Sequence, residues 1–137
     1  MIPLEVKHPL ETQHRPIRVL LADDELDVRK MIERRLAAKG YEVIVASDGE
    51  QALRLARDRS PDVLVLDIMM PKLPGDAVAS ELKNDSRTAS IPVIFLTCLV
   101  GPDEAAKSEF HIGRNLVLPK PLESARLITM IEALVQR

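Results

Sequence analysis

The ten residues from Asp62 to Pro71 constrain the fold of this chain more than any other stretch. The run from Val63 to Leu66 is apolar throughout, a pattern typical of a central parallel strand that is buried on both faces. Because Pro71 cannot continue a hydrogen-bonded ladder, the strand is predicted to end near Asp67. In open α/β sheets, ligands bind outside the carboxyl ends of the strands. Asp67 is therefore the first candidate for a functional residue.

Apolar runs and helical apolar periods alternate along the rest of the chain. Strands are expected at 17–22, 41–45, 63–67, 91–97 and 116–118. Helices are expected around Val28–Leu36, Ala52–Ala56, Ala77–Leu82, about 102–111 and Leu127–Val135. Such alternation predicts an α/β fold: a doubly wound, flavodoxin-like, five-stranded parallel sheet in the order 2-1-3-4-5, with five helices on its two faces.

Composition narrows the class of protein. The 137 residues suit one domain at 17–137, preceded by an arm at 1–16 that carries three prolines and shows no regular period. The net charge of −2, without a basic stripe, argues against direct nucleic-acid binding. The single cysteine, Cys98, fits a reducing compartment. Because we find no signal peptide and no membrane span of about 20 apolar residues, a cytoplasmic location is expected.

Polar residues follow the ends of four predicted strands. The first strand leads into Asp23 and Asp24, and the others lead to Asp67, Thr97 and Lys120. In the 2-1-3-4-5 order, the three aspartates meet in one pocket, where their mutual repulsion calls for a hard divalent cation. Mg²⁺ suits a few carboxylates together with water and phosphate oxygens. The pattern therefore predicts phosphoryl transfer.

Each predicted residue has a chemical role in that hypothesis. Asp67 is the nucleophile, because a carboxylate can attack phosphorus to form an acyl phosphate. Asp23, Asp24 and Asp67 bind Mg²⁺, with the backbone carbonyl of Met69 as a further ligand. Thr97 offers a hydroxyl to one phosphoryl oxygen. Lys120 offers a positive charge to another.

The motifs Asp23-Asp24-Glu25, Asp67-Ile68-Met69-Met70-Pro71, Thr97 and Lys120-Pro121, in this order and spacing, resemble the receiver domain of bacterial response regulators, over about residues 17–137. The resemblance implies two-component signalling. Asp67 would take a phosphoryl group from a sensor histidine kinase or a phosphotransfer protein, and Mg²⁺ would be required. Such a chain is a signalling phosphoacceptor, which catalyses only its own phosphorylation and dephosphorylation.

The resemblance also implies an output. Thr97 would move toward the phosphate and reshape the face made by the helix at 102–111, the strand at 116–118 and the last helix. That face would regulate a downstream protein and could form a weak dimer of an otherwise monomeric protein. The chain would be either a stand-alone regulator or the receiver part of a longer protein. One departure concerns this output: Val117 stands where the family usually has an aromatic residue that swings inward with the threonine.

Two other functions fit parts of the pattern. Aspartate-nucleophile phosphohydrolases of the haloacid dehalogenase type carry a second aspartate two residues after the nucleophile, where this chain has Met69. Flavodoxin-like flavin carriers share the predicted topology, but the acidic run after the first strand would repel the flavin phosphate. Both are weaker interpretations than the receiver.

Overall fold

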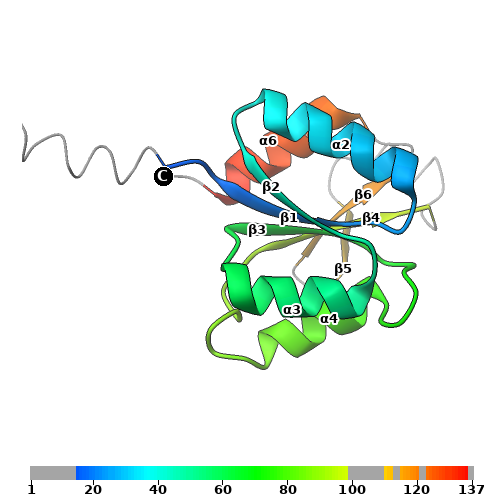
Figure 1. Ribbon diagram of the computed structural model, residues 1–137, viewed down its shortest axis with the longest axis vertical. Helices are drawn as coiled ribbons and strands as arrows, with labels where there is room; N and C mark the ends of the chain where they lie inside the picture. The colour runs from blue at the N-terminus through cyan, green and yellow to red at the C-terminus, as the bar shows by residue number, and fades with distance from the viewer. Residues whose placement is uncertain (1–14, 99–109, 113–114, 121–122, 136–137) are drawn as a thin grey trace, which may run out of the picture.

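Strands and helices alternate through the described part of the chain. The computed structural model describes residues 15–98, 110–112, 115–120 and 123–135 (Figure 1). The strands are β1 (Arg18–Ala22), β2 (Glu42–Ala46), β3 (Val63–Asp67), β4 (Val93–Thr97), β5 (Phe110–Ile112) and β6 (Asn115–Pro119). The helices are α2 (Leu26–Ala38), α3 (Gly49–Arg59), α4 (Gly75–Lys83) and α6 (Ser124–Leu134). No described helix combines the length and the apolar character that a membrane span requires.

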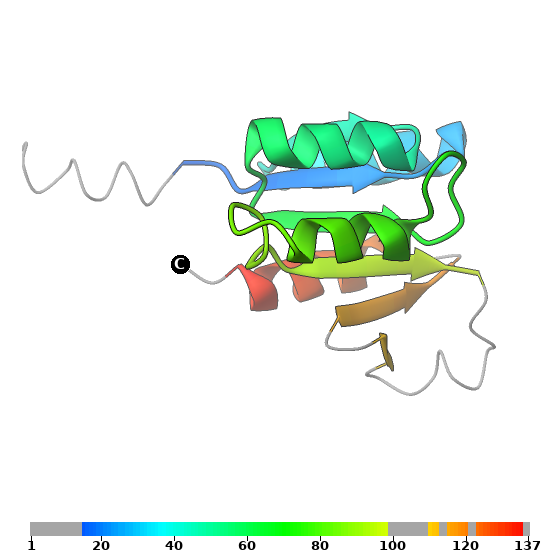
Figure 2. The ribbon, with the colours of Figure 1, turned by 90° about the horizontal axis from the view of Figure 1, so that it is seen from below.

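The strands form one sheet in the order β2-β1-β3-β4-β6-β5. The first five strands of this order are parallel neighbours. Because β6 contains the fifth strand expected from the sequence, at 116–118, this confirms the predicted order 2-1-3-4-5. Figure 2 shows that β1, β3 and β4 point to the same edge of the sheet. In the register of the sheet, Ala22 lies opposite Leu66, and Asp67 lies opposite Leu96. The residues that follow these strands therefore gather along one edge.

The prediction of five helices is wrong for the described residues, which form four. Most of the helix expected at about 102–111 lies outside the described residues, and its last two positions belong to β5. This strand, Phe110–Ile112, pairs antiparallel with β6, so that Phe110 lies opposite Val117. Its apolar–polar–apolar order has the period of two that suits a strand.

Two apolar layers hold helices against the sheet. Figure 1 shows α2 and α6 on one face and α3 and α4 on the other. Every residue of β3 is buried, as expected for a central strand that is covered on both faces. The layer under α3 and α4 includes Ala52, Ala56, Val78 and Leu82. The layer under α2 and α6 includes Ile32, Leu36, Leu127 and Ile131.

The helix ends and the start of the sheet are fixed by local interactions. Asp48 caps α3, since its side chain accepts a hydrogen bond from the N–H of Gln51 at 2.8 Å. Gly40, with φ of +95°, follows the end of α2 in a conformation that glycine adopts without strain. Arg15, within the predicted arm, pairs with Asp62 at 3.0 Å. Residues 1–14 lie outside the described residues, so the arm stays a prediction.

The start of α4 packs directly under the loop that follows Asp67. The N–H of Gly75 donates to the carbonyl of Ile68 at 2.9 Å. A Cβ atom at Gly75 would overlap the carbonyl oxygen of Asp67 and lie 3.1 Å from the Cα of Ile68. A glycine at this position therefore lets the backbone after β3 lie on the helix.

We expect Gly75→Ala to lower the free energy of unfolding by about 2 kcal/mol or more, because the added methyl group has to displace the backbone of Asp67. Urea unfolding followed by circular dichroism would measure this. The control, Ser80→Ala on the exposed side of the same helix, should change stability by less than about 0.5 kcal/mol. Equal stability of the two variants would contradict the close approach.

Candidate functional site

Asp67 is the last residue of β3 and is 4% exposed. Its Oδ1 accepts a hydrogen bond from the N–H of Met69 at 3.1 Å, and its Oδ2 accepts one from Lys120 Nζ at 3.1 Å. Burial raises the pKa of Asp67 to about 6, and the charge of Asp23 adds to the shift, whereas Lys120 and the N–H of Met69 oppose it. The carboxylate is thus held in place in an environment that disfavours its charge.

Asp23 follows β1 and is fully buried. Its N–H donates to the carbonyl of Ala46 in β2 at 3.2 Å, and its Oδ1 accepts from the N–H of Glu25 at 2.9 Å. Its Oδ2 is buried and lies 2.8 Å from Lys120 Nζ as an ion pair, but has no hydrogen bond of good geometry among the described residues. Its contact with Lys120 is therefore one of charge, and a bound metal ion would share this oxygen with the ammonium group.

Lys120 connects the carboxylates. Its Nζ lies 2.8 Å from Asp23 Oδ2, and 3.1 Å from both Glu25 Oε1 and Asp67 Oδ2. Burial acts to lower the pKa of Lys120, but its bonds to the three carboxylates prevail and raise the pKa above its ordinary value. The ammonium group is therefore charged at neutral pH.

The structure brings the predicted residues together to different degrees. Asp23, Asp67 and Lys120 are in direct contact. Thr97 is the last residue of β4, is 1% exposed, and accepts a hydrogen bond at its backbone carbonyl from the N–H of Lys120 at 2.9 Å. Asp24 and Met69 are exposed and line a neighbouring hollow of about 670 Å³.

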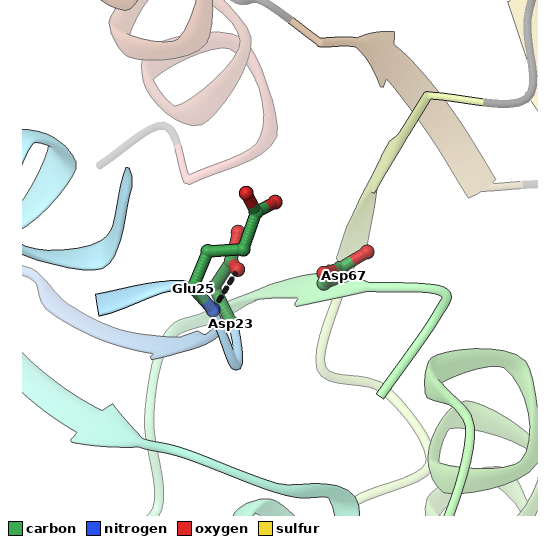
Figure 3. Close-up of side chains that lie close together, drawn as sticks. All are labelled: Asp23, Glu25 and Asp67. Atoms are coloured by element: carbon green, nitrogen blue, oxygen red, sulfur yellow. Dashed lines mark hydrogen bonds between the residues drawn. The ribbon is translucent and has the colours of Figure 1, made fainter. Parts of the chain in front are cut away.

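Glu25 is a member of the site that the sequence analysis did not single out. Carboxylate oxygens of Asp23, Glu25 and Asp67 lie within 4.8 Å of one another, and Figure 3 shows the three side chains beside one another. Glu25 stands at the N-cap of α2 but makes no side-chain capping bond, so its carboxylate is left to pair with Lys120. The sequence signal for Glu25 was that it is the third consecutive acidic residue after β1.

The donor set fits a divalent cation of the Mg²⁺ type. All the candidate ligands are oxygens, and the carboxylates converge from two neighbouring strand ends. Asp24 and Met69 border the hollow next to them. The arrangement offers a buried carboxylate, a paired ammonium group and a cation-binding face, which together suit chemistry on an anionic group.

Comparisons with known proteins find relatives along most of the chain. The family profile of the response regulator receiver domain matches residues 19–132. The chain is 41% identical over 128 residues to a protein from Guillardia theta named probable transcriptional regulator ycf27, a match that covers 93% of this chain and 48% of the relative. The chain thus spans about half the length of the curated relatives it matches.

Solved structures show the same fold. The receiver domain of a Francisella response regulator superposes with a TM-score of 0.75 at 32% identity, covering 90% of this chain and 98% of that one. The receiver domain of a sensor histidine kinase from Pseudomonas aeruginosa, with a magnesium ion coordinated in its active site cleft, superposes with a TM-score of 0.77 at 27% identity. It covers 90% of this chain and 100% of that one.

The raised pKa of Asp67 predicts a pH-dependent effect of Asp67→Asn on stability. A carboxyl group whose pKa rises on folding stabilises the fold fully below its unfolded pKa, and this contribution is lost as the pH rises through its folded pKa of about 6. The amide does not ionise. In EDTA at about pH 7.5, we therefore expect the variant to be more stable than the original chain by about 1–3 kcal/mol.

At about pH 4 the gain should largely vanish, because Asp67 is protonated in the folded protein. Urea unfolding at the two pH values would measure both differences. Asp58→Asn, which makes the same change on the exposed side of α3, should change the free energy of unfolding by less than about 0.5 kcal/mol at both pH values. A gain of equal size at both pH values would refute the desolvation argument.

Proposed function

The chain belongs to the response regulator receiver domain family of two-component signalling, and from this premise we propose that Asp67 accepts a phosphoryl group from a sensor histidine kinase or a phosphotransfer protein. The observation that carries the proposal is the position of Lys120 Nζ, which contacts Asp67 and Asp23 at the carboxyl edge of a parallel sheet. An ammonium group at this position can balance the charge of a group transferred to Asp67.

The proposal includes Mg²⁺. Asp23, Asp24, Asp67 and the backbone carbonyl of Met69 would hold the ion, which offsets negative charge on the phosphoryl oxygens. Support comes from the buried Oδ2 of Asp23, from the convergence of carboxylates, and from the related Pseudomonas receiver that coordinates magnesium. Glu25 lies in the same cluster, but its contact with Lys120 gives it the separate role of partner to the ammonium group.

The chemical step uses residues that are already in place. A carboxylate oxygen of Asp67 forms a bond to phosphorus while the bond from phosphorus to the donor's imidazole nitrogen breaks, and its electron pair leaves with the imidazole. The Met69 N–H and Lys120 orient the attacking carboxylate through their hydrogen bonds. Lys120 and the hydroxyl of Thr97 then bind phosphoryl oxygens of the product.

The proposed output is a change of conformation that regulates a downstream protein. Thr97 and Lys120 are joined by a backbone hydrogen bond, so movement of Thr97 toward a phosphoryl group acts directly on the end of β6. Val117, two residues before the Pro119 that pairs with Thr97, is buried and replaces the usual aromatic residue. We propose that the signal leaves through strands β4 and β6 without an aromatic side chain changing position.

Nucleic-acid binding by the whole protein is a separate question. The low net charge of this chain argues against direct contact, but relatives of about twice its length are named probable transcriptional regulators. The comparisons therefore do not support the prediction that the protein makes no direct contact with nucleic acid. We limit the proposal to phosphoryl transfer and a protein partner, with the chain a monomer or a weak dimer through the face that includes β6 and α6.

Mass spectrometry of the intact protein tests the proposal. After incubation with phosphoramidate and Mg²⁺, we expect the mass of one phosphoryl group to be added, because Asp67 is the nucleophile. The adduct should be lost in Asp67→Asn and without Mg²⁺. Asp58→Asn, which removes an exposed carboxylate from α3, should retain it. An adduct that survives Asp67→Asn would place the phosphoacceptor elsewhere.

A further inference from the structure

The backbone of Asp23 is held by a residue outside the acidic cluster. Arg29 Nη1 donates to the backbone carbonyl of Asp23 at 2.8 Å. The N–H of Asp23 is bonded to Ala46, its Oδ1 to the N–H of Glu25, and its Oδ2 is paired with Lys120. Arg29 therefore fixes the one polar group of Asp23 that neither β2 nor the cluster holds.

The position of Arg29 on α2 explains how it reaches Asp23. Its own N–H donates to the carbonyl of Glu25 at 2.9 Å, which closes the first turn of the helix. Helical side chains lean toward the N-terminus of their helix, so the half-buried guanidinium group extends back over the turn between β1 and α2. This turn carries Asp23 and Asp24, the two acids that approach the proposed cation from β1.

A polar neighbour of Arg29, Ser47, has its donors engaged elsewhere. Arg29 lines a hollow of about 150 Å³, together with Ser47 and Gln51. The hydroxyl and the N–H of Ser47 both donate to Gln51 Oε1, at 3.1 Å and 2.8 Å. Both donors of Ser47 are thus engaged with Gln51, so Ser47 does not replace the guanidinium group at the Asp23 carbonyl.

We infer that Arg29 is a positioning residue for the cation site: its hydrogen bond to the Asp23 carbonyl sets the β1–α2 turn so that Asp23 and Asp24 face the ion together. This inference rests on the proposed function. Arg29 acts through Asp23 and touches neither the ion nor the phosphoryl group. Groups that orient metal ligands in this way contribute strongly to metal affinity, and their loss weakens binding by about 10- to 100-fold.

Calorimetric titration of the full chain with MgCl₂ tests the inference. Arg29→Met keeps much of the aliphatic stem and removes the donors, so we expect its Kd for Mg²⁺ to rise about tenfold. The control is Lys30→Ala, which removes the same charge from the adjacent, exposed position. Its Kd should stay within about twofold of the original chain, because exposed charges are screened by salt. Arg29→Lys keeps the charge and a donor and should recover most of the affinity.

A second readout separates positioning from stability. At saturating Mg²⁺, phosphorylation of Arg29→Met by phosphoramidate should reach a rate within about twofold of the original chain, since the reacting groups are intact. If Arg29→Met does not fold, as judged by circular dichroism, Arg29→Leu, which also lacks a donor, replaces it with the same expectation. An unchanged Kd, or a loss equal to that of Lys30→Ala, would overturn the inference. Absence of Mg²⁺ binding by the original chain would instead contradict the proposed function.

Discussion

The carboxyl edge of this sheet depends on one ammonium group placed among three carboxylates. Burying Asp23 and Asp67 next to each other is costly, because like charges repel and neither is fully hydrated. Lys120 Nζ offsets this cost by contacting both at 2.8 and 3.1 Å, and Glu25 also approaches it at 3.1 Å. One ammonium group paired with three carboxylates leaves this cluster acidic. This imbalance makes the edge suited to a divalent cation and to chemistry on a phosphoryl group.

The sheet topology, which the sequence predicts well, creates this meeting of distant residues. Apolar runs located most of the parallel strands, an alternating run located the strand at 41–45, and the alternation of strands with helical periods indicated a doubly wound parallel sheet. From the predicted order it follows that Asp23, Asp67, Thr97 and Lys120 end neighbouring strands at one edge, as the structure has them. The prediction works because a central strand such as β3 is covered on both faces, so its sequence is a continuous apolar run that is easy to recognise.

The parts that the sequence did not reveal depend on side-chain direction and on short pairings. In the sequence, Glu25 and Arg29 look like ordinary charged residues of a solvated surface. The path of the β1–α2 turn brings Glu25 to Lys120 and Arg29 to the Asp23 carbonyl. Strand β5 alternates apolar and polar residues, but a run of three residues is too short to be predicted as a strand from the sequence. Only two residues of the chain separate it from its antiparallel partner β6.

The packing around Val117 bears on how a chemical event at this edge would leave the site. Val117 is 1% exposed and belongs to the apolar layer under α3 and α4, so a change of its side-chain position would have to displace close-packed neighbours. The backbone link between Lys120 and Thr97 runs along the pairing of β4 with β6 and requires no change of side-chain position at Val117. In the proposed function, Lys120 gives up carboxylate partners for a phosphoryl oxygen, and this exchange pulls on the end of β6 itself. In this proposal, the Lys120 ammonium group stabilises the unphosphorylated edge and also transmits the effect of phosphorylation to the rest of the sheet.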